Sequence, residues 1–184
     1  SGLLYSVLGC VVEAADALHL PNFGTAKNRF AEGFDLFEHH FDGREIFRRA
    51  VKGMAQETNI VLHELGLTQK DIDCIIPHQA NLRIIESLAK YLSVDMSKVE
   101  VNIQHYGNTS AATIPVALVE ALEGGRIEPG DRILLAAFGA GLTRAAGLLR
   151  WGPRTSPLGR SDAQLPPCDN TALEILGGAI RDAD

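Results

Sequence analysis

Short apolar runs alternate with amphipathic segments between residues 43 and 122, and this alternation restricts the possible fold most strongly. Residues 42–65 repeat apolar side chains at spacings of three and four, which is typical of a helix with one buried face. Residues 73–76 form a short apolar run that ends at Pro77 and has the length of a buried strand. Such alternation predicts an α/β fold, in which helices pack on a sheet.

The helix predicted at 42–65 has start and stop signals. Asp42 is the expected N-cap, and Glu45 lies three residues later, as in a capping box. Gly66 is the expected C′ residue, at which a left-handed backbone ends many helices. The expected apolar face comprises Ile46, Phe47, Ala50, Val51, Met54, Val61, Leu62 and Leu65.

The other elements follow from the same patterns. Helices are predicted at 82–92 and 111–122, and further strands at 3–12, 99–103, 132–138 and 142–151. Pro115 should lie in or near the first turn of its helix, where a missing N–H matters least. A tight bend at 139–141 should join the last two strands as a hairpin, so the predicted sheet has five strands and is mixed.

The composition excludes several classes of protein. The net charge of -6 comes from acidic and basic residues mixed along the chain, which argues against a nucleic-acid binder. No apolar stretch is long enough to cross a membrane. Cys10, Cys74 and Cys168 are widely spaced, so we expect no disulfide framework, a cytoplasmic location and no zinc site.

The composition of the sequence changes after Trp151. Four prolines break up a polar segment, and a short helical stretch is expected at 172–180. We therefore divide the chain into a domain at 1–151 and a Pro-rich tail at 152–184, which either packs on the surface or is partly disordered.

Two polar loops, at 77–81 and 105–112, each lie between a predicted strand and a predicted helix. In open α/β sheets, loops beyond the carboxyl ends of strands bind ligands. His78 and Asn108 could both donate hydrogen bonds to one carbonyl oxygen and stabilise negative charge there. The simpler explanation, which spacing alone favours, is that both side chains satisfy backbone groups of their turns.

Four motifs, in this order, resemble those of β-ketoacyl-acyl-carrier-protein synthase III. They are Asp42-Gly-Arg-Glu-Ile-Phe47, Pro77-His-Gln-Ala-Asn-Leu-Arg-Ile-Ile85, Gly107-Asn-Thr-Ser-Ala-Ala112, and the closing pair Gly124-Gly-Arg-Ile-Glu-Pro-Gly130 and Ala136-Ala-Phe-Gly-Ala-Gly-Leu-Thr143. The resemblance covers residues 2–151 and implies one thiolase-like half of a five-layer αβαβα enzyme, namely the C-terminal half. Members of this family usually dimerise.

The family catalyses a decarboxylative Claisen condensation between an acyl group taken from acyl-coenzyme A and malonyl-acyl-carrier protein. The resemblance implies that His78 and Asn108 bind the malonyl thioester carbonyl and stabilise the enolate, with no permanently bound cofactor. It implies that Phe138 lies beside the nucleophile, although this residue could equally be a core residue of its strand. Ala140 stands where the family has a glycine of the oxyanion hole, so a backbone donor requires dihedral angles that allow a Cβ.

Substrate contacts are implied at two further positions. Asn81 resembles a residue near the pantetheine arm, and Arg83 resembles one that meets the acyl carrier protein, unless it is simply a solvated helix residue. Leu142 and Arg144 replace aromatic residues that are usual in the bacterial housekeeping enzymes.

None of the three cysteines matches the nucleophile of the family, which lies in the N-terminal half. We therefore expect a Cys-bearing N-terminal half, in the same chain or a separate one, as partner. Two alternatives remain: a condensing or acyltransferase relative of specialised metabolism, and a non-catalytic scaffold.

Overall fold

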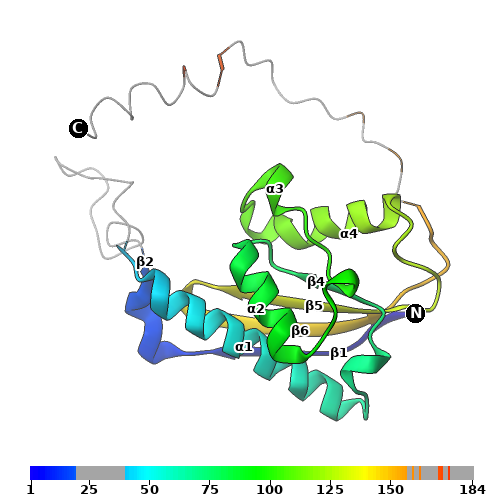
Figure 1. Ribbon diagram of the computed structural model, residues 1–184, viewed down its shortest axis with the longest axis horizontal. Helices are drawn as coiled ribbons and strands as arrows, with labels where there is room; N and C mark the ends of the chain where they lie inside the picture. The colour runs from blue at the N-terminus through cyan, green and yellow to red at the C-terminus, as the bar shows by residue number, and fades with distance from the viewer. Residues whose placement is uncertain (20–39, 157–158, 160–161, 163–169, 172–173, 175–184) are drawn as a thin grey trace.

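The structure, a computed structural model, describes residues 1–19, 40–156, 159, 162, 170, 171 and 174 (Figure 1). Its main sheet is mixed and has four strands in the order β1 (Gly2–Cys10), β6 (Thr143–Arg150), β5 (Arg132–Gly139) and β4 (Cys74–Pro77). β6 pairs antiparallel with both β1 and β5, whereas β4 pairs parallel with β5. The predicted hairpin around 139–141 is thereby confirmed.

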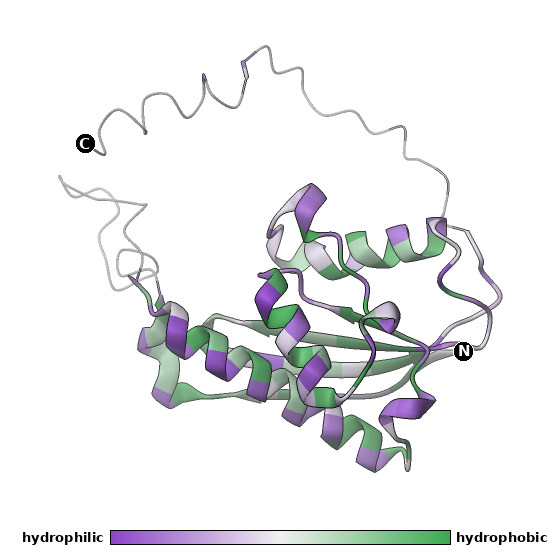
Figure 2. Ribbon diagram, viewed as in Figure 1, coloured by the Kyte–Doolittle hydropathy of each residue, from purple (hydrophilic) through white to green (hydrophobic). Residues whose placement is uncertain are grey.

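Helices cover both faces of this sheet. Ile75 and Leu134 pack with residues of α1 (Gly43–Glu64) and α2 (Leu82–Leu92). Their neighbours Ile76 and Ile133 pack with α4 (Thr113–Glu123) on the other face, because successive side chains of a strand point to opposite sides. Figure 2 shows mostly hydrophobic strands and alternating hydrophobic and hydrophilic bands along α1. The predicted α/β layering is confirmed.

Short elements connect these layers. A second, two-stranded sheet pairs β2 with β3. The remaining elements are η1 (Val12–Ala17), β2 (Leu18–His19), β3 (His40–Phe41), η2 (Gln69–Asp71), η3 (Met96–Lys98), α3 (Ile103–Tyr106), η4 (Ser110–Ala112) and η5 (Ala140–Leu142).

The ends of α1 were predicted correctly, except for one detail. The Asp42 side chain accepts hydrogen bonds from the backbone N–H groups of Arg44 and Glu45, at 3.1 and 3.0 Å. The Glu45 carboxylate does not close a capping box, because it binds the guanidinium groups of Arg48 and Arg49 instead. Gly66 follows the helix with a φ of 63°, as its C′ role requires.

The fifth strand, predicted at 99–103, is wrong beyond its first residue. Val99 forms a single parallel bridge with Ile75, after which the chain turns into α3. The buried Gln79 side chain explains this, because its amide replaces a neighbouring strand. It donates to the carbonyl oxygens of Pro77 and Glu100 and accepts from the Asn102 N–H.

A partly buried ion pair ties β6 to α1. The Nε of Arg144 donates to the carboxylate of Glu57, whose side chain is only 3% exposed. Two glycines leave room for this pair. A Cβ at Gly9 would lie 2.6 Å from Glu57 Oε1 and 2.8 Å from Arg144 Nε, and one at Gly53 would lie 3.0 Å from Arg144 Cδ.

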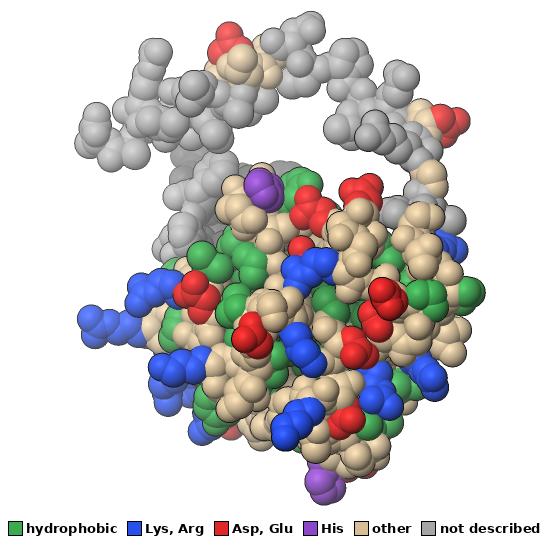
Figure 3. Space-filling view, turned by 45° about the vertical axis from the view of Figure 1, so that its right-hand side comes forward, with side chains coloured by type: hydrophobic (Ala, Val, Ile, Leu, Met, Phe, Trp, Pro, Cys, Tyr) green, Lys and Arg blue, Asp and Glu red, His purple; other side chains and the backbone are tan. Residues whose placement is uncertain are grey.

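Several large apolar side chains of the edge strand β1 are exposed in this chain. Leu8 is 84% exposed and lies opposite Ala145 of β6, and Leu3 is 61% exposed. Figure 3 shows further hydrophobic side chains among the charged ones at the surface. A thiolase-like half on its own is expected to expose apolar surface at a sheet edge, and β1 is such an edge.

Some sequence predictions fall on residues outside the described ranges. These are most of residues 18–41, for which the sequence predicts no regular element, the helical stretch at 172–180 and most of the tail at 152–184, so the division at Trp151 stays a prediction. Within the described part of the chain, no helix combines the length and apolar character that membrane crossing requires.

Gly9→Ala should lower the free energy of unfolding by about 1–3 kcal/mol, because the new methyl group must displace the partly buried Glu57–Arg144 ion pair. Denaturant unfolding of the protein measures this change. Gly159→Ala is the matched control, since nothing lies within 4 Å of a Cβ there. Equal stability of both variants would contradict the packing role of Gly9.

Candidate active site

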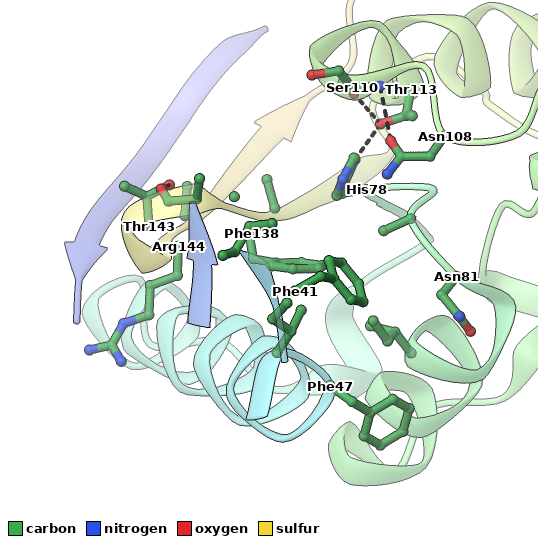
Figure 4. Close-up of a pocket in the computed structure, with 18 of the residues that line it drawn as sticks. Phe41, Phe47, His78, Asn81, Asn108, Ser110, Thr113, Phe138, Thr143 and Arg144 are labelled. Carbon is green, nitrogen blue, oxygen red and sulfur yellow. Dashed lines mark hydrogen bonds between the residues drawn. The ribbon is translucent and has the colours of Figure 1, made fainter. Parts of the chain in front are cut away.

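A cavity of about 2420 Å³ opens at the carboxyl ends of the parallel strands β4 and β5. All six residues that the sequence suggested for catalysis or binding line it: His78, Asn81, Arg83, Asn108, Phe138 and Ala140. They come from the ends of β4 and β5, the start of α2 and the loop before α4 (Figure 4). The tertiary structure thus brings together side chains that lie up to 62 positions apart.

His78 continues directly from β4. Its backbone N–H donates to the Ala136 carbonyl oxygen at 2.8 Å, which extends the pairing with β5 and fixes the backbone of His78. Its ring meets the edge of Phe138, with centroids 5.5 Å apart and an interplanar angle of 67°. The ring Nδ1 lies 2.6 Å from Thr113 Oγ1. Burial lowers the pKa of His78, which favours a neutral ring near pH 7.

Asn108 is oriented by its own loop. Its Oδ1 accepts a hydrogen bond from the Ser110 N–H at 2.9 Å. Because the oxygen is engaged in this way, the amide NH2 group is the part left to donate, and Figure 4 shows it on the side of His78. The simpler explanation from the sequence therefore holds in part, since the oxygen satisfies turn backbone while the nitrogen stays available.

Ser110 organises both polar side chains. Its φ of 55° lies in the left-handed region, which costs a non-glycine residue about 1–3 kcal/mol. In this conformation its N–H binds Asn108, and its carbonyl oxygen accepts from the Thr113 hydroxyl at 2.9 Å. Ser110 thereby bonds both to Asn108 and to Thr113, which in turn contacts the ring of His78.

The bend between β5 and β6 forms another wall of the cavity. The φ of Ala140 is not positive, so its Cβ causes no backbone strain. The position in this bend that needs a glycine is Gly141, with a φ of 127°. Thr143 Oγ1 closes the bend by donating to the Ala140 carbonyl at 3.2 Å. The φ of Ala140 therefore allows a Cβ, which is what a backbone donor at this position requires.

Asn81 and Arg83 stand at the start of α2. Asn81 is the N-cap, and its Oδ1 accepts from the Arg83 N–H at 2.9 Å. Arg83 is exposed beside the cavity. Their proposed substrate contacts stay predictions, whereas the capping role of Asn81 is a function that the motif did not reveal.

Leu142 and Arg144, at which the sequence suggested departures from the resembled family, have different surroundings. Leu142 is buried in a small cluster with Ala14, Ala17 and Ile46. Arg144 lies on the cavity wall, but its guanidinium points away toward Glu57 (Figure 4). Of these two residues, only Arg144 lines the cavity, and its charged end is held by Glu57.

The described cysteines differ in burial, and the described residues hold no cluster of metal-binding side chains. No three of the described His, Cys, Asp and Glu residues lie close enough to hold a metal ion. Cys74 is buried, as expected for a structural thiol, and burial raises its pKa to about 11. Cys10 is exposed on the cavity wall, and Cys168 lies outside the described residues.

Sequence reasoning missed Ser110, Thr113 and Glu57. Thr113 carried a weak signal, because a threonine at the start of a helix often turns its hydroxyl back to nearby backbone groups. Nothing local marks Glu57, since its partner Arg144 is 87 positions away.

The chain resembles known proteins over most of its length. Residues 62–151 match the family model described as 3-oxoacyl-[acyl-carrier-protein (ACP)] synthase III C terminal. A beta-ketoacyl-[acyl-carrier-protein] synthase III 2 of Vibrio cholerae is 52% identical over 179 residues, which is 97% of this chain and 49% of the relative. The chain thus spans about half the length of the curated relatives it matches.

Solved structures share its fold. The crystal structure of 3-oxoacyl-[acyl-carrier-protein] synthase III from Aquifex aeolicus is 39% identical, with a TM-score of 0.72 over 82% of this chain and 45% of that one. The corresponding protein from Pseudomonas aeruginosa is 35% identical, with a TM-score of 0.73 over 84% of this chain and 45% of that one.

His78 should make the protein less stable in acid. Since burial lowers its pKa in the folded state, the unfolded state binds more protons, and the free energy of unfolding falls as the pH drops below about 6.5. His78→Gln should therefore lose less stability than the parent protein between about pH 7.5 and about pH 5.5 in denaturant titrations. His63→Gln, at an exposed position of α1, is the control. An unchanged pH dependence in His78→Gln would refute the effect.

Proposed function

Because this chain belongs to the β-ketoacyl-[acyl-carrier-protein] synthase III family and corresponds to its C-terminal part, we propose that it supplies the decarboxylation donors of a condensing enzyme. It has the thiolase-like α/β fold of the solved relatives. In the proposed reaction, an acyl group from acyl-coenzyme A is condensed with malonyl-acyl-carrier protein, with loss of carbon dioxide. No permanently bound cofactor takes part in it.

One observation carries this proposal: the Asn108 side chain and the His78 ring line one cavity. Each is oriented by a hydrogen bond, from the Ser110 N–H to Asn108 Oδ1 and between His78 Nδ1 and the Thr113 hydroxyl at the start of α4. Loss of carbon dioxide from a malonyl thioester leaves a negative charge on the thioester oxygen. A fixed donor beside that oxygen stabilises the enolate without reorganisation during the reaction. The Asn108 amide has this donor character at any pH, because it does not titrate.

The neighbouring residues have supporting roles in the proposal. Phe138 packs edge-on against the His78 ring and gives that side of the cavity an apolar wall, which strengthens electrostatic interactions by excluding water. Ala140 offers its backbone N–H to the acyl intermediate. Asn81 lies along the path of the pantetheine arm, and Arg83, exposed at the rim, meets the phosphate-bearing carrier protein.

The proposed reaction also needs a nucleophilic cysteine, and we assign it to an N-terminal half on the same or a separate polypeptide. The exposed apolar side chains of β1 are consistent with a surface that such a half would cover. The complete enzyme is proposed to be a homodimer.

Asn108→Ala in the complete enzyme should lower the rate of malonyl-thioester decarboxylation by about 10²–10³-fold, because one enolate donor is removed. Acylation of the cysteine should continue largely unchanged. Carbon dioxide release and acyl-enzyme mass measure the two steps separately. Asn59→Ala, on the outer surface of α1, is the matched control. An equal loss of both steps would contradict the role of Asn108.

The intact masses of all polypeptides in the native sample test the need for a Cys-bearing half. The expected result is either a longer chain that includes this sequence or a second species with a reactive cysteine. A single active species of 19.8 kDa would contradict the proposed division of labour.

A further inference from the structure

The Thr113 hydroxyl lies between two partners at the back of the cavity. Its Oγ1 is 2.6 Å from Nδ1 of His78 and 2.9 Å from the carbonyl oxygen of Ser110. Thr113 is 2% exposed, so water does not compete for either contact. Figure 4 shows both interactions as a continuous path from the ring to the loop.

The positions of the hydrogens follow from the chemistry of these three groups. A hydroxyl carries one hydrogen, and a carbonyl oxygen can only accept. Two oxygens at 2.9 Å therefore require the hydroxyl hydrogen between them. That leaves only lone pairs of Oγ1 for the ring, so Nδ1 of His78 must be the donor. A neutral imidazole has a single N–H, and its other nitrogen then carries a lone pair.

We propose that Thr113 is a positioning residue that holds the ring proton of His78 on Nδ1 and leaves Nε2 as a hydrogen-bond acceptor. The Ser110 carbonyl is part of this arrangement, because it fixes the direction of the Thr113 hydroxyl. The left-handed φ of Ser110 aims that carbonyl at Thr113 while its N–H binds Asn108.

The consequence for catalysis rests on the proposed function. Asn108 is always a donor, whereas neutral His78 accepts at Nε2 and donates there only after it has taken up a proton. The two groups are therefore not equivalent, although the sequence suggested them as a matched pair of donors. The lowered pKa of His78 is consistent with a ring that is neutral before substrate binds.

Long-range ¹H–¹⁵N correlation spectra of ¹⁵N-histidine-labelled protein, in its complete native assembly, report the tautomer directly. The His78 signals are identified by their loss in His78→Gln. The parent protein should show a protonated Nδ1 and an unprotonated Nε2. Thr113→Ser keeps the hydroxyl and should give the same pattern. Thr113→Val has nearly the same shape without the hydroxyl, and its Nε2 signal should shift toward the protonated position.

Two results would overturn the proposal. One is a protonated Nε2 with an unprotonated Nδ1 for His78 in the parent protein. The other is an unchanged pattern in Thr113→Val, with thermal unfolding used to verify that this variant is folded. Because the spectra are recorded without substrate, they decide the role of Thr113 even if the protein fails to condense malonyl thioesters. Failure of the proposed function would appear only in the decarboxylation assay with Asn108→Ala.

Discussion

The parallel pairing of β4 with β5 is the constraint on which the rest of the site depends. The pairing continues through a hydrogen bond from the backbone N–H of His78 to the Ala136 carbonyl oxygen, and it places the ring of His78 against Phe138. A parallel pair needs helices on both faces, because its short apolar strands have no solvated side. Here α1 and α2 cover one face and α4 covers the other. The cavity then forms where both strands end, bordered by the loops that lead into α2 and α4.

Residues 108–113, which lead through η4 into the start of α4, orient two polar side chains of the site through their backbone. Ser110 adopts a conformation that costs a non-glycine residue free energy, and both its backbone groups are used. Strain of this kind persists only where the surroundings over-determine it, and here it orients Asn108 and Thr113 together. Ser110 and Thr113 thus determine which atoms of Asn108 and His78 can donate or accept hydrogen bonds in the cavity.

The Glu57–Arg144 pair links the cavity wall to α1. An arginine on the cavity-lining strand would be costly to bury alone, but a carboxylate on α1 neutralises it, and two glycines make room for both. The apolar side chains left exposed on β1 mark a second feature of the chain. The core of the protein lies under the helix-covered faces, whereas the edge strand β1 leaves Leu3 and Leu8 exposed.

The sequence by itself determined the helices at 43–64 and 82–92, the hairpin of the last two strands and the two polar loops, because these depend on local periodicity, caps and glycine positions. It could not determine the end of the pairing after Val99, which the amide of Gln79, 20 positions earlier, imposes. It also pointed to His78 and Asn108 but not to the difference between them. Only the tertiary structure decided that difference, since the hydroxyl that orients the His78 proton belongs to α4, 35 positions away. Periodicity reveals which face of an element is buried, whereas hydrogen-bond partners depend on how distant elements pack.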